Sequence, residues 1–107
     1  MRSVGPKTRK DPPLPSLPKV RSAGLSWLVW DVGGAERVRP LWRSYTRATN
    51  ALVFVVDSSS SDDRLEEART ELANLTKGLA QECCMAQRPR PPLLVLANKQ
   101  VIYKIYN

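Results

Sequence analysis

Cysteine is scarce in this sequence of 107 residues, and its placement excludes two common classes of small protein. The two cysteines present, Cys83 and Cys84, are adjacent. An adjacent pair supplies neither a framework of disulfide bonds nor the ligand spacing of a structural zinc site. The sequence therefore predicts a protein of a reducing compartment, and we expect a cytoplasmic location.

Long apolar runs are also absent. No stretch approaches the ~20 apolar residues of a membrane-spanning helix, and the first residues lack the apolar segment of a signal peptide. Arg2 stands where N-myristoylation requires glycine, so we expect no such lipid anchor. The membrane contact that stays open is a peripheral, electrostatic one with anionic lipid.

Acidic residues are rare in the first part of the chain. Residues 1–24 hold six of the seventeen lysines and arginines and one acid, Asp11, which places +5 of the net charge of +7 in this segment. The segment has no aromatic side chain on which a nucleobase could stack. We interpret it as a solvated basic leader and expect no nucleic-acid partner.

Prolines set the same leader apart. Five of the nine prolines lie in the first twenty residues without hydrophobic periodicity, so residues 1–24 are predicted to be disordered or extended. The segment from Arg9 to Pro15 places a base before a PxxP pattern, which SH3 domains bind as a polyproline helix. An SH3-type partner is one hypothesis for the leader, and a plain solvated tail is the alternative.

Three short apolar runs predict buried strands. Residues 25–30 are rich in aromatic and β-branched side chains, residues 51–57 are an almost unbroken apolar run, and residues 93–97 form the third. Such continuous apolar character predicts burial on both faces, as in a parallel sheet.

Two helices are predicted between these strands. Residues 36–50 have apolar side chains at roughly helical spacing, broken by Pro40, which indicates an irregular helix. Leucines at steps of three and four predict an amphipathic helix over residues 62–82, with a serine as N-cap and acids in its first turn. The order β-α-β-α-β predicts an α/β fold with a parallel sheet.

Polar residues stand at the carboxyl end of all three predicted strands. They are Asp31, Asp57 and Asn98, and open α/β sheets bind their ligands beyond such ends. Gly33 and Gly34 permit a tight turn whose amides can face an anion. One polar residue at a strand end more often only begins a loop, whereas three together predict a site.

Four segments, in the same order, resemble the signatures of the Arf-like small GTPases. They are Trp30 to Gly34, Arg39 to Arg43 with Tyr45, Leu52 to Ser58, and Ala97 to Gln100. The resemblance covers about residues 28–100. It implies a partial P-loop GTPase fold and a nominal GTP-binding switch of the membrane-traffic type.

The resemblance also implies roles for the residues that match. Asp31 is expected to hold Mg²⁺ through water, and the Gly34 amide to meet the γ-phosphate of GTP. Asn98 and Lys99 are expected to contact the guanine base of GTP or GDP. Trp30 and Tyr45 match aromatic residues that Arf-like proteins present to protein effectors, and ordinary packing is the alternative for both.

Three departures from the family argue against activity. No GxxxxGK[ST] pattern occurs, so the loop that cradles the phosphates is missing. Ala35 replaces the glutamine that orients the attacking water, and its methyl group forms no hydrogen bond. Val101 replaces the aspartate that distinguishes guanine from adenine. We expect neither tight GTP binding nor hydrolysis, and therefore a pseudoenzyme.

The missing segments affect the fold as well. In the family's sheet the phosphate-loop strand lies between the strands that end at Asp31 and Asp57, so its loss predicts a gap and a marginally stable fold. The family's last strands and helices are also lacking. Residues 101–107 do not resemble the family, although their β-branched and aromatic side chains could supply a replacement strand.

Together these features predict a truncated Arf-like protein in three parts. A leader spans residues 1–24, a partial GTPase domain spans 25–100, and a tail spans 101–107. The alternative hypothesis is a non-enzymatic interaction protein that binds partners through the leader and through Trp30 and Tyr45.

Overall fold

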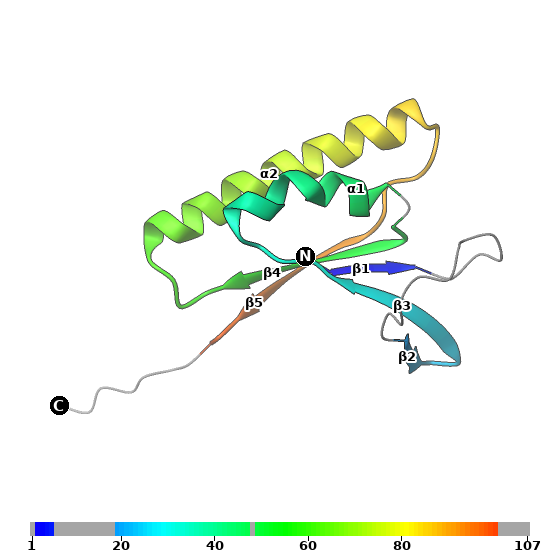
Figure 1. Cartoon of the computed structure of the whole chain (residues 1–107), viewed down its shortest axis with the longest axis horizontal. Helices are drawn as coiled ribbons and strands as arrows, with labels where there is room; N and C mark the ends of the chain where they lie inside the picture. Colours follow the sequence, from blue (N-terminus) through cyan, green and yellow to red (C-terminus); the bar gives the residue numbers. More distant parts are fainter. Residues whose placement is uncertain (1, 6–18, 48, 101–107) are drawn as a thin grey trace.

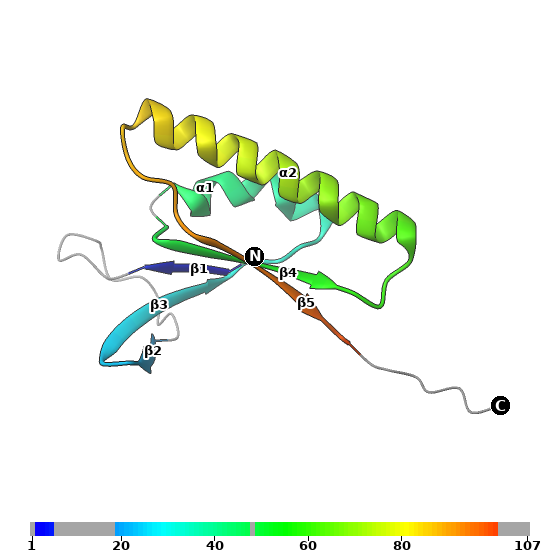
Figure 2. The ribbon, with the colours of Figure 1, turned by 180° about the vertical axis from the view of Figure 1, so that it is seen from behind.

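The structure, a computed structural model, describes residues 2–5, 19–47 and 49–100. Five strands form one sheet in the order β2-β3-β1-β4-β5. Both α-helices lie on the same side of this sheet, so the described part of the chain has two layers (Figure 1 and Figure 2). The elements are β1 (Arg2–Gly5), β2 (Lys19–Ser22), β3 (Leu25–Asp31), the 3₁₀ helix η1 (Glu36–Leu41), α1 (Trp42–Thr46), β4 (Ala51–Asp57), α2 (Asp62–Met85) and β5 (Leu93–Asn98).

Strands β3, β4 and β5 coincide with the three apolar runs of the sequence. β4 and β5 pair in parallel, from Leu52 opposite Leu93 to Asp57 opposite Asn98. β3 runs in the same direction as β4, because each is antiparallel to the strand between them. The predicted α/β class is confirmed, and the three strands direct their carboxyl ends toward the same edge of the sheet.

Strand β1 fills the centre of the sheet and corrects one expectation. It lies between β3 and β4 and pairs with both, with Arg2 opposite Asp31 on one side and Val53 on the other. The expected gap is therefore closed. Within residues 1–24, Arg2–Gly5 and Lys19–Ser22 are strands, which is the extended form of the two that the sequence allows. Buried strands need partners for their backbone amides and carbonyls, and an extended segment supplies them in either direction. Here the direction is antiparallel, so the sheet is mixed.

Strand β2 joins β3 through a two-residue hairpin. Ser22 pairs with Leu25, which leaves Ala23 and Gly24 as the turn. Both have positive φ, 51° at Ala23 and 73° at Gly24, as a type I′ turn requires. The leader and the partial domain of the sequence analysis are thus connected here by continuous sheet pairing.

The helices follow the predicted pattern. Pro40 lies inside η1, and α1 continues directly from it, which is the irregular helix expected over residues 36–50. Helix α2 extends three residues beyond its predicted end. Ser61 occupies its N-cap position in an extended conformation but makes no side-chain cap bond. Among the described residues no helix combines the length and the apolar character needed to cross a membrane.

The hydrophobic core lies between the sheet and the helices. It consists of Trp42, Leu52, Phe54, Leu75 and Leu79. The expected burial of the strands on both faces is wrong, because the described helices cover one face only (Figure 2). On β5 almost every side chain is exposed, although the sequence of this strand is as apolar as that of a buried one.

Candidate functional site

The end of β4 and the end of β5 form one compact polar group. Asp57 lies opposite Asn98 across the parallel ladder. The carbonyl oxygen of Asn98 accepts hydrogen bonds from the Ser58 amide at 3.0 Å and from the Ser58 hydroxyl at 2.6 Å. The structure therefore brings together two of the three predicted strand-end residues.

Asp31 lies apart from that pair. Across β1, Asp31 is level with Val53, because Arg2 pairs with both. Asp57 comes four residues after Val53, which places it ~13 Å further along the strand direction at ~3.3 Å per residue. Asp31, the predicted Mg²⁺ residue, is thus displaced along the strand direction from Asn98, a predicted guanine-contacting residue, although their strands end toward the same side of the sheet.

Lys99 is held by Asp57. Its Nζ donates to Asp57 Oδ2 at 2.8 Å, and Lys99 itself has a left-handed backbone with φ of 59°. The Ser59 amide and hydroxyl donate to Asp57 Oδ1 at 3.0 and 2.6 Å. The hydrogen bond from Lys99, followed by those from Ser59, lowers the pKa of Asp57 to about 2. The lysine expected to lie over the guanine ring is therefore engaged in an ion pair.

This pair has a predictable acid titration. The pKa of Asp57 is lower in the folded chain than its usual 3.8, so the pair stabilises the fold above about pH 4, and this stabilisation is lost as the pH falls through about 2. In a Lys99→Met variant the Asp57 midpoint, followed by carboxyl NMR shifts, is expected to rise toward 3.8. A matched Lys77→Met change on exposed α2 should leave it unchanged. A wild-type midpoint near 3.8 would contradict the ion pair.

The Gly33–Gly34 segment is fixed by two side chains from the helical layer. Trp42 Nε1 donates to the Gly33 carbonyl at 2.9 Å, and Arg39 Nε donates to the Gly34 carbonyl at 2.9 Å. A Cβ atom built on Gly34 would meet no atom within 4 Å. This glycine therefore lies in open space rather than in a tight cradle.

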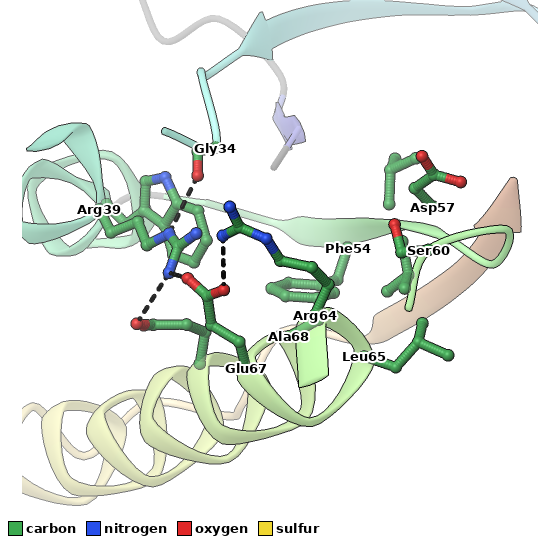
Figure 3. Close-up of a pocket in the computed structure, with 13 residues that line it drawn as sticks. Gly34, Arg39, Phe54, Asp57, Ser60, Arg64, Leu65, Glu67 and Ala68 are labelled. Carbon is green, nitrogen blue, oxygen red and sulfur yellow. Dashed lines mark hydrogen bonds and ion pairs between the residues drawn. The ribbon is translucent and has the colours of Figure 1, made fainter. Parts of the chain in front are cut away.

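Arg39 links this segment to helix α2. Its Nη1 donates to Glu67 at 2.6 Å and to Glu71 at 3.3 Å, and Arg64 donates to Glu67 at 2.8 Å (Figure 3). The Arg39 side chain is 18% exposed. The hydrogen bond to Glu67 raises the pKa of Arg39, and the bonds from Arg39 and Arg64 lower the pKa of Glu67. Glu67 is thereby kept ionised.

This ion-pair cluster was missed in the sequence analysis. Glu67 and Glu71 lie four residues apart on α2, and that spacing places them on one side of a helix. The signal was present, but only the tertiary structure shows which base from the preceding segment they meet.

A cavity of about 270 Å³ lies between these groups. Asp57 and Ser60 lie at one end, and Arg39 with Glu67 lies at the other, while Phe54 forms part of its wall (Figure 3). Its charged side chains are already in ion pairs, Arg39 and Arg64 with glutamates of α2, and Asp57 with Lys99 from outside the lining. Within the described ranges no group of three or more histidine, cysteine, aspartate or glutamate residues could hold a metal ion.

Trp30 and Tyr45 lie against one another on the helical side of the sheet. Their ring centroids are 5.6 Å apart, with an angle of 54° between the ring planes. Trp30 is half-buried, and Tyr45 is 36% exposed. The pair is therefore both a packing contact and an accessible aromatic surface, which agrees with each of the two readings of the sequence.

Ala35 immediately precedes η1, and its carbonyl accepts the Val38 amide at 2.9 Å. Its methyl group offers no hydrogen bond, and its place opposite the family's glutamine stays a prediction. Val101, the SH3-type segment 9–15 and the proposed replacement strand within 101–107 lie outside the described residues.

Comparison with known proteins shows one family. The model of the ADP-ribosylation factor family matches residues 13–106. The Arf-like protein 4D of Mus musculus is 52% identical over 84 residues, which are 78% of this chain and 38% of that protein. The Arf-like protein 4C of Homo sapiens is 51% identical over 81 residues, which are 76% of this chain and 38% of that protein. The chain thus spans well under half of these relatives, and no solved structure matches it.

Proposed function

The chain belongs to the ADP-ribosylation factor family, and from this premise we propose that it is an Arf-like protein without a working GTP cycle. It neither binds GTP and Mg²⁺ tightly nor hydrolyses GTP. A cytoplasmic location and a relation to membrane traffic are part of the proposal, on the family's resemblance alone.

The direction of β1 supports this proposal most. β1 occupies the place of the family's phosphate-loop strand but is antiparallel to β3 and β4. A phosphate loop must leave the carboxyl end of its strand at the edge where Asp31 and Asp57 lie. β1 ends with Gly5 opposite Leu28, so its carboxyl end points to the edge opposite the one where Asp31 and Asp57 lie.

The remaining residues fit Mg²⁺-GTP poorly. Lys99 is paired with Asp57, the Gly34 carbonyl is held by Arg39, and Ala35 has no hydrogen-bonding side chain. Asp31 as a water-mediated Mg²⁺ ligand stays a prediction, as do the contacts of Asn98 with guanine. We therefore assign no catalytic step to any of these groups.

Isothermal titration with GTP and Mg²⁺ tests the proposal. Without a phosphate cradle we expect a Kd no tighter than about 1 mM, which corresponds to about 4 kcal/mol of binding free energy. Circular dichroism on the same sample shows that the chain is folded. The proposal is wrong if GTP binds at micromolar Kd or tighter. A tenfold loss of that binding in Lys99→Met or Gly34→Val would then show that the predicted residues form the site.

The accessible Trp30–Tyr45 pair favours a second candidate, a non-enzymatic interaction role. Aromatic side chains that are partly exposed and rigidly packed are common anchors of protein interfaces. This role needs no nucleotide, and the two proposals are compatible. It requires that Tyr45→Ala or deletion of residues 9–15 weaken an association with a protein effector, and it fails if neither change does.

A further inference from the structure

Two connecting segments lie side by side at the end of the sheet where β4 and β5 begin. One joins α1 to β4, and the other, residues 86–92, joins α2 to β5 (Figure 1). The Leu52 amide donates to the Pro92 carbonyl at 2.9 Å, which ties the two segments together. Four residues of this region make up what we call the basic end: Arg47, Met85, Arg88 and Arg90.

The basic end holds three arginines, and no acid stands among the described residues of the two segments. Arg47 and Arg90 are exposed, and Arg88 is half-buried. None of the three forms an ion pair with a described residue. Glu82, near the end of α2, is paired with Arg43. Cations that are close together and unpaired favour an anionic partner.

The other ends of β4 and β5 have the opposite charge. Asp57, Asp62 and Asp63 lie there, and Lys99, which is paired with Asp57, is the one base within residues 57–63 and 98–100. β4 spans Ala51–Asp57, so it separates the two ends by ~20 Å at ~3.3 Å per residue. The Debye length at physiological ionic strength is ~8 Å. The acids therefore do not cancel the field of the basic end.

An apolar side chain is exposed beside these arginines. Met85, the last residue of α2, is 79% exposed, whereas Leu79 and Cys83 of the same helix are buried. Pro89 and Pro92 are exposed as well. A methionine in water gains nothing from folding, but it can leave water at the boundary between lipid headgroups and acyl chains.

We propose that the basic end binds the surface of an anionic membrane. The three guanidinium groups then contact lipid headgroups, and Met85 enters the boundary between headgroups and acyl chains. The exposed methionine favours a bilayer over a soluble polyanion, since nucleic acid offers charge without an apolar layer, and the basic end has no aromatic side chain on which a base could stack. Asp57 and Asn98 then face away from the membrane.

Co-sedimentation of the full chain with phospholipid vesicles tests the inference. The wild-type chain should bind vesicles with about 30% phosphatidylserine and should not bind vesicles of phosphatidylcholine alone. Each base near an anionic surface contributes roughly fivefold to binding, so the double variant Arg88→Gln/Arg90→Gln should bind about 25-fold more weakly.

The double variant Arg37→Gln/Arg69→Gln is the matched control. It removes the same two charges, but from η1 and the first half of α2, away from the basic end. Because salt screens distant charges, its binding should stay within about threefold of wild type. Both double variants keep the basic residues 1–24, so the comparison separates the basic end from that segment.

Met85→Gln tests the apolar part of the contact. Burial of the thioether does not depend on charge, so the variant should bind roughly tenfold more weakly in ~0.5 M salt as well as at low salt. Circular dichroism checks that each variant is folded.

Three results would overturn the inference. The first is a wild-type chain that binds neither kind of vesicle or both kinds equally. The second is an equal loss of binding in the two double variants, which would mean that overall charge decides. The third is a DNA oligonucleotide that displaces the chain from vesicles, with Met85→Gln having no effect, since a site for soluble polyanions would behave that way. The inference does not depend on the proposal about GTP and survives the failure of that proposal.

Discussion

Replacing Val4 with proline is expected to abolish cooperative unfolding of the chain. Val4 lies in the central strand β1, opposite Val29 of β3 and Ala51 of β4. Proline has no backbone N–H, so within a central strand it removes a ladder bond, and for this reason proline occurs in sheets essentially only on edge strands or at bulges. Two neighbouring strands then carry unpaired backbone groups, each of which costs ~1–3 kcal/mol when buried.

A thermal melt followed by circular dichroism measures this effect. Val20→Pro is the matched control, because β2 lies at the edge of the sheet and pairs with β3 alone. It should lower the melting temperature less than Val4→Pro does. Equal effects of the two changes would mean that β1 does not hold the central position. Val4→Thr, which keeps the N–H, should leave a cooperative transition.

Trp42→Ala should have the second large effect. Trp42 is 6% exposed, its ring lies edge-on to Phe54 at 5.9 Å, and its Nε1 holds the Gly33 carbonyl. Truncating a buried tryptophan removes apolar contacts and leaves a cavity, which costs ~3–5 kcal/mol. In a domain of ~5–15 kcal/mol total stability, the loss could leave much of the chain unfolded at 25 °C.

Urea denaturation measures that loss. Trp42→Phe keeps an aromatic ring beside Phe54 but removes the hydrogen bond to Gly33, so it should cost less than the alanine variant. Its amide-exchange rates around Gly33 and Gly34 should rise, because their anchor is gone. A Trp42→Ala loss under about 1 kcal/mol would show that the core lies elsewhere.

Sequence patterns predict best the helices and strands whose formation depends on residues close to one another in the chain. The apolar runs at 51–57 and 93–97 became β4 and β5, and the leucine spacing over 62–82 became α2. Periodicity and helix signals act within a few residues, so they can be read without knowing the fold. The same patterns failed on burial, since an apolar run does not indicate how many layers will cover it.

The candidate site also has one part that the sequence predicts and one part that it does not. Asp57 and Asn98 were predicted at one sheet edge because parallel strands share their carboxyl ends, and the structure places them opposite one another. The pairing of Lys99 with Asp57, 42 residues away, and that of Arg39 with Glu67, 28 residues away, could not be predicted. Spacing within a helix or strand says nothing about which distant partner a charge will meet.

By itself, the sequence determined the family, through four segments in order, and it contains no GxxxxGK[ST] pattern. Only the tertiary structure decided that Arg2–Gly5 closes the sheet and in which direction. Strand pairing is a long-range choice, and backbone groups accept a partner of either polarity. That choice closes the expected gap in the sheet. The sequence also did not show that the described helices would cover only one face of it.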